Sequence, residues 1–523
     1  MHDFPTDRPV KVAFIRPPRH FWPIINESDN FLLPLGYPCL ASYLREKMEG
    51  VQVEILDCCV LRIGYASLEK WFEDNHPDVV AIGELTMYGK EGFRAFDLAR
   101  KVLPDVVNIA GGQLYSALPE WTLDQCPSID FVIRNEGEET LRDLLETLRS
   151  GGDPAGVLGI DFKSGERHVQ TGPRPLIQDL DSMPMPAYDI AHLDRYSPFG
   201  NLWPRAATVQ RSRGCHYECP YCSWWVHEGE HRLEDGELVP HKAYRTKSAQ
   251  RMIAETELLY EKHGVRYLFW VDGTWNLDSH WLDEYCSELI RRRYELGWWA
   301  FVRADLLIRQ DREGTLEKMV QAGLRHVLVG IERGNDDGLQ SIQKTGYTRD
   351  STKEAFNILR KKYPQVFRQG TILTGLWEDD GDSIRSQLTY AHEINVDFPA
   401  FHPLMPFPGT PLFEEAKKLG RIEEWDFSNY DMMYPVMPTE HLTRAEVARH
   451  TTWCYSNFVS KKPLRFFSRL LSPHRIRRRL HWWFLFAIVR TLVVDLWKSI
   501  KGEKHFEGFA ATNQMWKPDY YDK

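Results

Sequence analysis

The chain has 523 residues, of which 65 are basic and 74 acidic, and hydrophobic residues make up 43% of it. At about 150 residues per domain this length predicts two to four domains, and the composition excludes collagenous, disordered and polytopic membrane proteins. The net charge of −9 leaves no excess of cations for phosphates, which argues against nucleic-acid binding. The apolar run near the N-terminus is too short for a signal peptide, so a cytoplasmic, reducing location is expected.

Residues 1–150 alternate short apolar runs with helical stretches. Strands that are apolar throughout indicate a parallel sheet covered by helices on both faces. We therefore expect a doubly wound, Rossmann-like α/β domain in this part of the chain. Its five expected strands are Val10–Arg16, Val51–Asp57, Asp78–Gly83, Val106–Ala110 and Ile129–Arg134.

Residues 151–205 break this rhythm. A hairpin is expected within Val157–Gly172, and four prolines between 173 and 186 indicate an extended linker. Between 206 and 420 six further strand–helix units predict a partial (β/α)6 barrel of the TIM type, with its chemistry at the carboxyl ends of the strands. The six expected strands are Ala206–Gln210, Tyr267–Asp272, Trp298–Arg303, His326–Glu332, Gly370–Gly375 and Phe401–Leu404.

The tail, residues 421–523, is expected to be mainly helical. Four arginines between 475 and 479 precede the apolar run Trp482–Val489, and Arg490 and Asp495 interrupt the apolar residues beyond it. These charges argue against a transmembrane span. Two alternatives remain for this basic, apolar helix: it packs on the barrel, or it makes a peripheral contact with a membrane surface.

Three of the nine cysteines are clustered, with the spacing Cys-x3-Cys-x2-Cys: Cys215, Cys219 and Cys222. They follow the first strand of the expected barrel, where an active site is predicted. A structural zinc site would need four ligands, usually from two paired knuckles; a nearby histidine could supply the fourth, but the sequence has no second Cys-x2-Cys. Three thiolates fit a [4Fe–4S] cluster better and leave one iron open to another ligand.

The cysteine segment, with the aromatic Tyr221 just before its last cysteine, resembles the radical S-adenosylmethionine (SAM) superfamily over about residues 206–420. The resemblance implies that the three cysteines hold the cluster and that the open iron binds the amino and carboxylate groups of SAM. Cleavage of SAM would yield methionine and a 5′-deoxyadenosyl radical, which removes a hydrogen atom from substrate. A flavodoxin- or ferredoxin-type reductant is then expected as a partner.

Five residues are expected to contact SAM on this resemblance: Tyr221 of the cysteine segment and four residues at later strand ends. Asp272 takes the place of an acidic residue near SAM, although the second acid of that pair is Gly273 here. Arg303 is expected to bind the SAM carboxylate, because a guanidinium group pairs with a carboxylate in a bidentate way. Glu332 would accept ribose hydroxyls or the amino group, and Gly375 would let the adenine approach the backbone.

A doubly wound domain ahead of such a barrel resembles the cobalamin-binding domains of cobalamin-dependent radical SAM enzymes. The matching segments are Leu33–Tyr37, Asp78–Gly83, Ala110–Ser116 and Arg134–Glu138. The crevice at the carboxyl ends of the strands would take the cofactor. The residues expected to contact cobalamin are Leu35, Gly36, Gly111, Gly112, Ser116 and Glu136.

Two absent motifs refine this expectation. The chain has no Asp-x-His-x-x-Gly, so the resemblance implies a cobalt without a protein imidazole. It also has no Gly-x-Gly-x-x-Gly after the first strand, which disfavours a dinucleotide. Another nucleotide, or a structural domain with an empty crevice, is the alternative to cobalamin.

Segments after Trp425 and Arg475 resemble the anaerobic magnesium-protoporphyrin monomethyl ester cyclases and their methylase relatives. The resemblance implies methylcobalamin-dependent C-methylation of an unactivated carbon, and the 18 tryptophans indicate a hydrophobic substrate such as a tetrapyrrole, terpenoid or polyketide. An oxidative cyclase, or another non-methylating radical reaction, is the first alternative. A non-catalytic corrinoid or iron–sulfur sensor is the second.

Overall fold

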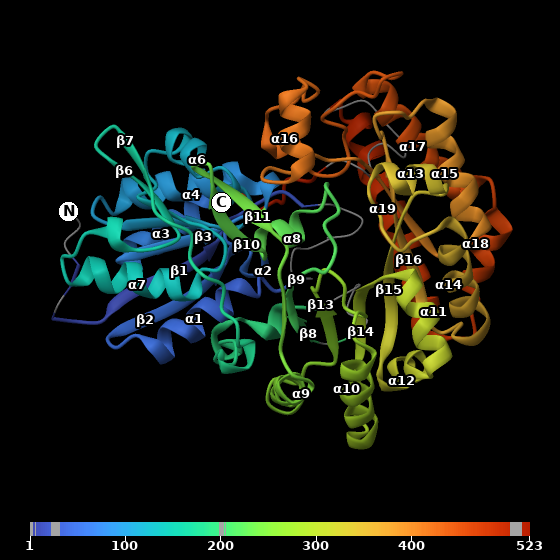
Figure 1. Ribbon diagram of the computed structural model, residues 1–523, viewed down its shortest axis with the longest axis horizontal. Helices are drawn as coiled ribbons and strands as arrows, with labels where there is room; N and C mark the ends of the chain where they lie inside the picture. The colour runs from blue at the N-terminus through green and yellow to red at the C-terminus, as the bar shows by residue number, and fades with distance from the viewer. Residues whose placement is uncertain (1–3, 6, 22–31, 198–202, 204, 503–514) are drawn as a thin grey trace.

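The computed structural model describes residues 4–5, 7–21, 32–197, 203, 205–502 and 515–523. Two sheets lie side by side in Figure 1: an N-terminal sheet in blue and teal on the left, and a second sheet in green to orange on the right. The predicted α/β class, with two mainly parallel sheets and a helical tail, is confirmed.

The N-terminal sheet has seven strands in the order β2-β1-β3-β4-β5-β6-β7, and its first five strands are parallel. The expected hairpin does not lie apart as a linker: it joins the sheet as two antiparallel strands, with Phe162 opposite Phe131. It covers the edge that β5 would otherwise expose. The strands are β1 (Val10–Arg16), β2 (Val51–Asp57), β3 (Val79–Gly83), β4 (Val107–Gly111), β5 (Phe131–Ile133), β6 (Ile160–Ser164) and β7 (Arg167–Gln170).

Both faces of this sheet are buried. Val12 and Phe14 belong to one hydrophobic cluster, whereas Ala13 and Ile15 belong to another, because successive side chains of a strand point to opposite faces. This is why the strands are apolar throughout in the sequence. The helices of this part are α1 (Gly36–Lys47), α2 (Cys58–Leu61), α3 (Tyr65–Asn75), α4 (Gly89–Val102), α5 (Gly112–Ala117), α6 (Pro119–Gln125) and α7 (Glu138–Arg149).

The second sheet contains all six predicted strands, parallel and in the order β17-β16-β15-β14-β13-β8. They are β8 (Ala206–Val209), β13 (Tyr267–Trp270), β14 (Gly297–Val302), β15 (Leu324–Glu332), β16 (Phe367–Thr374) and β17 (Phe398–Pro403). The helices around it are α9 (Ala249–Glu257), α10 (Ser279–Arg292), α11 (Ala304–Glu313), α12 (Thr315–Ala322), α13 (Asp336–Ser341), α14 (Arg349–Lys362), α15 (Gly381–Glu393) and α16 (Pro411–Lys418).

Small elements that the sequence did not indicate lie between the two sheets (Figure 1). Two antiparallel pairs flank the helix that comes after the clustered cysteines. They are β9 (Ser212–Gly214) with β12 (Tyr244–Thr246), and β10 (Glu230–Glu234) with β11 (Glu237–His241), around α8 (Ser223–His227).

The tail contains α17 (Arg444–Ser460), α18 (Pro463–Leu470) and α19 (Arg475–Ile500). The first half of α19 covers the amino ends of the second sheet, where the ring of Phe484 stacks 4.3 Å from that of Phe398. Packing on the barrel is therefore confirmed for one face of this helix. Among the described helices, none is long and apolar enough to cross a membrane. The last residues return to the N-terminal sheet, where Tyr521 packs on Tyr65.

Candidate functional site

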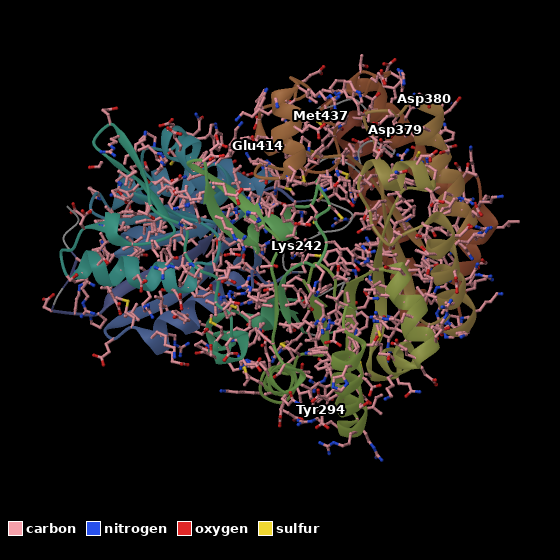
Figure 2. All side chains as sticks on the ribbon, in the orientation of Figure 1. Lys242, Tyr294, Asp379, Asp380, Glu414 and Met437 are labelled. Carbon is pink, nitrogen blue, oxygen red and sulfur yellow. The ribbon has the colours of Figure 1, made fainter. Side chains whose placement is uncertain are left out.

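The clustered cysteines lie on a loop that comes directly after β8 and β9. We call Cys215–Cys222 the cysteine loop. It leaves from Gly214, where φ is +82° and a Cβ atom would lie 1.9 Å from the carbonyl oxygen of Ala243. Only glycine fits there, and the N–H of the first cysteine then donates to Ala243 at 3.0 Å. Lys242, labelled in Figure 2, pairs with Glu218 at 2.8 Å, so the β11–β12 connection holds the loop from one side.

The thiols lie in largely apolar surroundings. The Sγ atom of Cys215 lies 3.7 Å from the Thr274 hydroxyl, and the indole N–H of Trp225 donates to the Cys219 carbonyl at 3.0 Å. Burial raises the pKa of Cys222 to about 12, and it also raises the pKa of Cys219. Coordination of a metal by these groups therefore requires that their protons be displaced.

The loop fits a cluster better than a single ion. Zinc ligands lie within about 2.0–2.3 Å of one ion, whereas each thiolate of an iron–sulfur cluster binds a different iron, which spreads the sulfurs apart. All three thiols are free. Three thiols on one short loop match a [4Fe–4S] cluster with one iron left without a protein ligand.

Glu332 ends β15 beside the cysteine loop in a strained conformation. Its φ is +60°, in the left-handed region that favours glycine. Its carboxylate pairs at 2.9 Å with Lys344, and both side chains are about nine-tenths buried. Burial raises the pKa of Cys219, and the nearby Lys344 ammonium acts in the opposite direction. The Glu332–Lys344 pair therefore lies close to this thiol. Sequence reasoning found Glu332 but missed Lys344, which no motif marks.

Arg303 lies just past β14 and reaches the cysteine loop from another strand end. Its guanidinium lies 3.7 Å from the centre of the Tyr217 ring. It also pairs with Asp305 at 3.0 Å and donates to the Thr345 carbonyl at 2.8 Å. The predicted residues Arg303 and Glu332 are therefore both brought to the cysteine loop, in partly buried positions that strengthen their interactions with a charged ligand.

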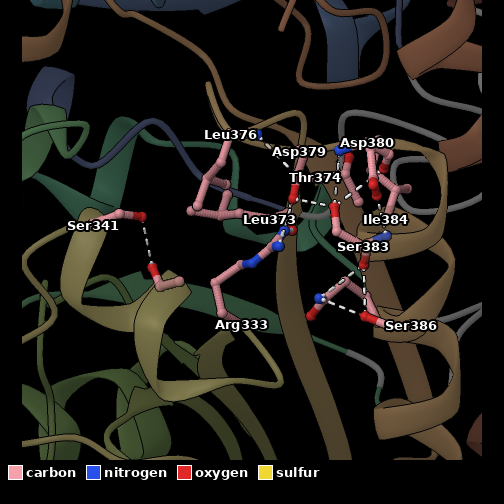
Figure 3. A network of polar contacts seen from close by, with 12 residues as sticks. Arg333, Ser341, Leu373, Thr374, Leu376, Asp379, Asp380, Ser383, Ile384 and Ser386 are labelled. Atoms are coloured by element: carbon pink, nitrogen blue, oxygen red, sulfur yellow. Dashed lines mark hydrogen bonds and ion pairs between the residues drawn. The ribbon is translucent and has the colours of Figure 1, made fainter. Parts of the chain in front are cut away.

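A buried ion pair joins the loops after β15 and β16, as Figure 3 shows. Arg333 and Asp379 lie 2.6 Å apart with side chains 3% exposed, and the same carboxylate accepts from the Leu376 N–H at 3.0 Å. Arg333 directly follows Glu332, and Leu376 directly follows Gly375. The pair therefore fixes two strand ends that carry predicted site residues.

Three predicted SAM contacts have other packing partners. Asp272 is fully buried and accepts from the backbone N–H and hydroxyl of Ser212 at 2.7 and 2.6 Å, so it fixes the approach to the cysteine loop. Gly375 has φ +69°, and a Cβ atom there would lie 2.8 Å from Val447 of α17. Tyr221 packs against an apolar cluster that includes Leu373.

A cavity of about 530 Å³, which we call the interdomain cavity, opens between the two sheets. On one side it is lined by the carboxyl ends of β3, β4 and β5 and the start of α1; on the other, by β8 and α8. This is the crevice where doubly wound sheets bind ligands. Five of the six residues predicted to bind cobalamin line it: Leu35, Gly36, Gly111, Gly112 and Glu136.

The lining of the crevice fits a large cofactor with polar side groups. A Cβ atom at Gly36 would meet nothing within 4 Å, and one at Gly111 only a carbonyl oxygen at 3.7 Å, so both leave room beside the backbone. At Gly112, with φ +80°, a side chain would instead clash with Glu84. Across the cavity, the Nε2 atom of His227 is buried and has no hydrogen-bond partner in the described part of the chain.

Two of the predicted cobalamin contacts, Ser116 and Glu136, are already engaged by the protein. The Ser116 hydroxyl donates to the Ile133 carbonyl at 2.9 Å. Glu136 pairs with Arg213 at 2.8 Å and with Arg245 at 2.7 Å. Burial alone would raise the pKa of Glu136, but the two guanidinium groups outweigh it and hold the pKa below its ordinary value. Because Arg213 lies two residues before the first cysteine, Glu136 ties the crevice to the cysteine loop.

Glu228 and Gln210 of the cavity wall were missed by sequence reasoning. Glu228 accepts from the Gly214 N–H at 2.7 Å and from the Gln210 amide at 2.6 Å. Burial raises the pKa of Glu228 to about 7. The sequence indicated Glu228 only by its position shortly after the last cysteine. Its hydrogen-bond partners lie 14 and 18 residues earlier and could not be inferred from a local pattern.

Two family models match the chain. The B12 binding domain matches residues 22–145, and the radical SAM superfamily matches residues 209–386. These segments contain most of the first sheet with its crevice, and the cysteine loop with most of the second sheet.

Relatives and solved structures share this organisation. An uncharacterized methyltransferase of Pyrococcus horikoshii is 27% identical over 429 residues, which are 81% of this chain and 87% of the relative. The anaerobic magnesium-protoporphyrin IX monomethyl ester cyclase of Cereibacter sphaeroides is 26% identical over 435 residues, 82% of this chain and 68% of the relative. The structure of the cobalamin-dependent S-adenosylmethionine radical enzyme OxsB, with aqua-cobalamin and S-adenosylmethionine bound, aligns with a TM-score of 0.68 and 18% identity over 94% of this chain and 73% of that one.

Proposed function

The chain joins a B12-binding domain to a radical SAM domain and is a cobalamin-dependent radical SAM enzyme; from this premise we propose that it methylates an unactivated carbon of a hydrophobic substrate. Its cofactors are cobalamin, SAM and a [4Fe–4S] cluster. The observation that carries the proposal is the interdomain cavity, because residues of both domains line one space beside the cysteine loop.

When bound, the cluster with SAM supplies a 5′-deoxyadenosyl radical, and cobalamin supplies a carrier for the methyl group. The chain's own part is to bind and orient these groups and to keep water away. In the proposal, Cys215, Cys219 and Cys222 ligate three irons of the cluster. The apolar packing of Trp225 and Val226 around the loop limits the access of water.

We assign SAM binding to the charged pair of strand ends beside the loop. Arg303 presents a guanidinium group of the kind that binds carboxylates, held in place by Asp305 and Tyr217. Glu332 offers a carboxylate to hydroxyl or amino groups, and Lys344 pairs with it at 2.9 Å in a buried position. We assign cobalamin to the crevice glycines, with the imidazole of His227 as a polar contact from the opposite wall.

Methylation is separated from cyclisation by the fate of the methyl group of SAM. The purified protein, loaded with iron and cobalamin without oxygen, is given a chemical reductant and SAM with an isotopically labelled methyl group. A methyltransferase transfers the label to protein-bound cobalamin. An enzyme that forms 5′-deoxyadenosine but leaves the cobalamin unlabelled contradicts methylation and favours the oxidative cyclase, which the likeness to the Cereibacter enzyme keeps as the second candidate.

The aromatic lining supports an apolar substrate. Trp224 lines the interdomain cavity, and its ring packs 5.2 Å from that of Phe301.

Reductive cleavage of SAM also needs an electron from outside the chain, and a flavodoxin- or ferredoxin-type protein is the proposed donor.

A further inference from the structure

The last two helices of the described residues expose an apolar face on the side away from the second sheet. The buried side chains of α19 recur every three or four residues, and so do its exposed ones, which places the two sets on opposite sides of the helix. We call the exposed set, with the exposed side chains of α18, the outer face. It consists of Leu464, Phe467, Leu471, Trp482, Phe486, Val489, Val493, Leu496, Trp497 and Ile500.

So large an apolar surface is unusual on a soluble monomer. Leu464, Leu471 and Ile500 are 86%, 80% and 70% exposed. Contiguous apolar patches of this kind mark sites that another surface covers, and a helix that is apolar on all sides is normally covered on all sides. The inner side of the first half of α19 packs on the amino ends of the second sheet through Leu480 and Phe484.

Charge indicates what covers the outer side. Residues 461–502 contain eleven basic residues and one acidic residue, although the whole chain has a net charge of −9. The basic residues are therefore concentrated in the two helices that also carry the outer face. An apolar surface surrounded by cations is complementary to an anionic lipid bilayer, with its acyl interior beneath a layer of phosphates.

The cations of this segment divide into two groups. Inward, Arg469 and Arg477 lie 3.5 and 2.6 Å from the buried Asp397, at the base of β17, and neutralise it. Outward, Arg475, Arg479 and Lys498 are exposed, and no carboxylate of the described chain lies within ion-pair distance of them. The inner group holds the helix on the barrel, and the outer group is free to bind phosphates.

We propose that the outer face docks on an anionic lipid bilayer, with α19 lying in the plane of the membrane. The helix has 26 residues and is about 39 Å long at 1.5 Å per residue. Its aromatic side chains would enter the boundary between headgroups and acyl chains. A second copy of this chain is the poorer occupant, because an isologous dimer would bring two strongly basic segments together.

The test uses the full-length protein, loaded with its cofactors and handled without oxygen. It is sedimented with vesicles of phosphatidylcholine alone and with vesicles that also contain phosphatidylglycerol. We expect binding to the anionic vesicles, weakened by added salt, and much less binding to the neutral ones.

Two variants separate the apolar from the charged contribution. Phe486→Ser with Trp497→Ser should weaken binding to anionic vesicles by about tenfold or more, since both rings would leave the acyl boundary. Arg475→Gln with Arg479→Gln should weaken it by about fivefold for each charge removed and leave the neutral vesicles unaffected. Leu233→Ser, on the exposed β10–β11 hairpin, is the matched control and should bind as the parent does.

Iron and cobalt content and circular dichroism show whether each variant is folded. Failure of the folded parent protein to sediment with anionic vesicles overturns the proposal. So does equal binding to neutral and anionic vesicles. A dimer in light scattering that Phe486→Ser with Trp497→Ser converts to a monomer would assign the outer face to a second copy instead.

Discussion

The cysteine loop and the crevice of the N-terminal sheet serve one cavity, yet they are built in opposite ways. The loop places three thiols within eight consecutive residues, and glycine at 214 and the β9–β12 pair fasten it locally. The crevice is assembled from segments between residues 35 and 136 that only the sheet brings together. A site formed by one short segment, such as the cysteine loop, depends on each of its residues. A site formed by several segments, such as the crevice, divides its binding free energy among many residues. Arg213, between the two, links them through Glu136 and Glu138.

The largest effect is expected in the cysteine loop. Cys219→Ala removes one of only three thiolates, so iron binding and 5′-deoxyadenosine formation should both be lost. Iron is measured per chain after anaerobic purification, and 5′-deoxyadenosine by chromatography after addition of SAM and reductant. Cys286→Ala, a buried cysteine of α10, is the control and should keep its iron. Normal iron content in Cys219→Ala would contradict the cluster assignment.

Substitution of Arg213, which links the cysteine loop to the crevice, should affect both regions. Arg213→Met leaves Glu138 buried without the partner that lies 2.5 Å away, which costs about 3–5 kcal/mol of folding stability. Thermal unfolding and cobalamin titration should show a lower melting temperature and weaker cobalamin binding. Arg142→Met, which removes a partly exposed pair with Asp143, should change stability by about 1 kcal/mol or less. Equal stability of the two variants would mean that the two regions are not coupled through Arg213.

Glu332→Gln should weaken SAM binding without loss of the cluster, and it should also lower stability because Lys344 loses its buried partner. Loss of the carboxylate removes a charge-assisted hydrogen bond, so the dissociation constant for SAM should rise by about tenfold or more while the iron content stays the same. Equilibrium dialysis of SAM against the iron-loaded protein measures this. Glu313→Gln, whose carboxylate lies 3.7 Å from Arg309 on the exposed side of α11, is the control. An unchanged SAM affinity would exclude Glu332 from the site.

A substitution in the crevice should have a smaller effect than one in the cysteine loop, and it should not change the iron content. Gly111 has an extended backbone with room beside it, so Gly111→Val should fold normally and fill part of the crevice floor. Cobalamin binding, measured by absorbance titration, should weaken severalfold with no loss of iron. Gly156→Val, where open space surrounds an exposed loop, should bind cobalamin normally. Cobalamin binding as tight as in the parent would place the cofactor elsewhere.

The smallest effect concerns pH. Burial raises the pKa of Glu228 to about 7, above its value in the unfolded chain, so the folded state binds more protons between the two values. The contribution of Glu228 to stability should therefore be largest at acidic pH and be lost as pH rises through about 7. Glu228→Gln should flatten this part of the profile, measured as melting temperature of the cofactor-free protein. A profile of unchanged slope would mean that Glu228 titrates normally.

Many expectations from the sequence are confirmed because they depend on neighbours in the chain. All six strands of the second sheet were predicted, since most residues of each strand are buried and most of the buried residues are apolar. The hairpin was predicted, but not that it would complete the first sheet, because strand pairing at an edge leaves no local pattern. The engagement of Glu136 by Arg213 was equally invisible, since the two residues lie 77 positions apart.

The sequence by itself determined the two α/β units and the cluster of three thiols. Both depend on neighbouring residues in the chain: the units on the pattern of apolar positions, and the cluster on the spacing of the cysteines. Only the tertiary structure decided that the residues flanking the cysteine loop line the same cavity as the crevice, and that Glu332 is paired with Lys344. It also decided that α19 buries Leu480, Phe484 and Ala487 and exposes Phe486, Val489 and Val493, since both groups are apolar in the sequence. In each case the deciding energy comes from contacts between distant segments, where buried charges must find partners and apolar surface must be covered.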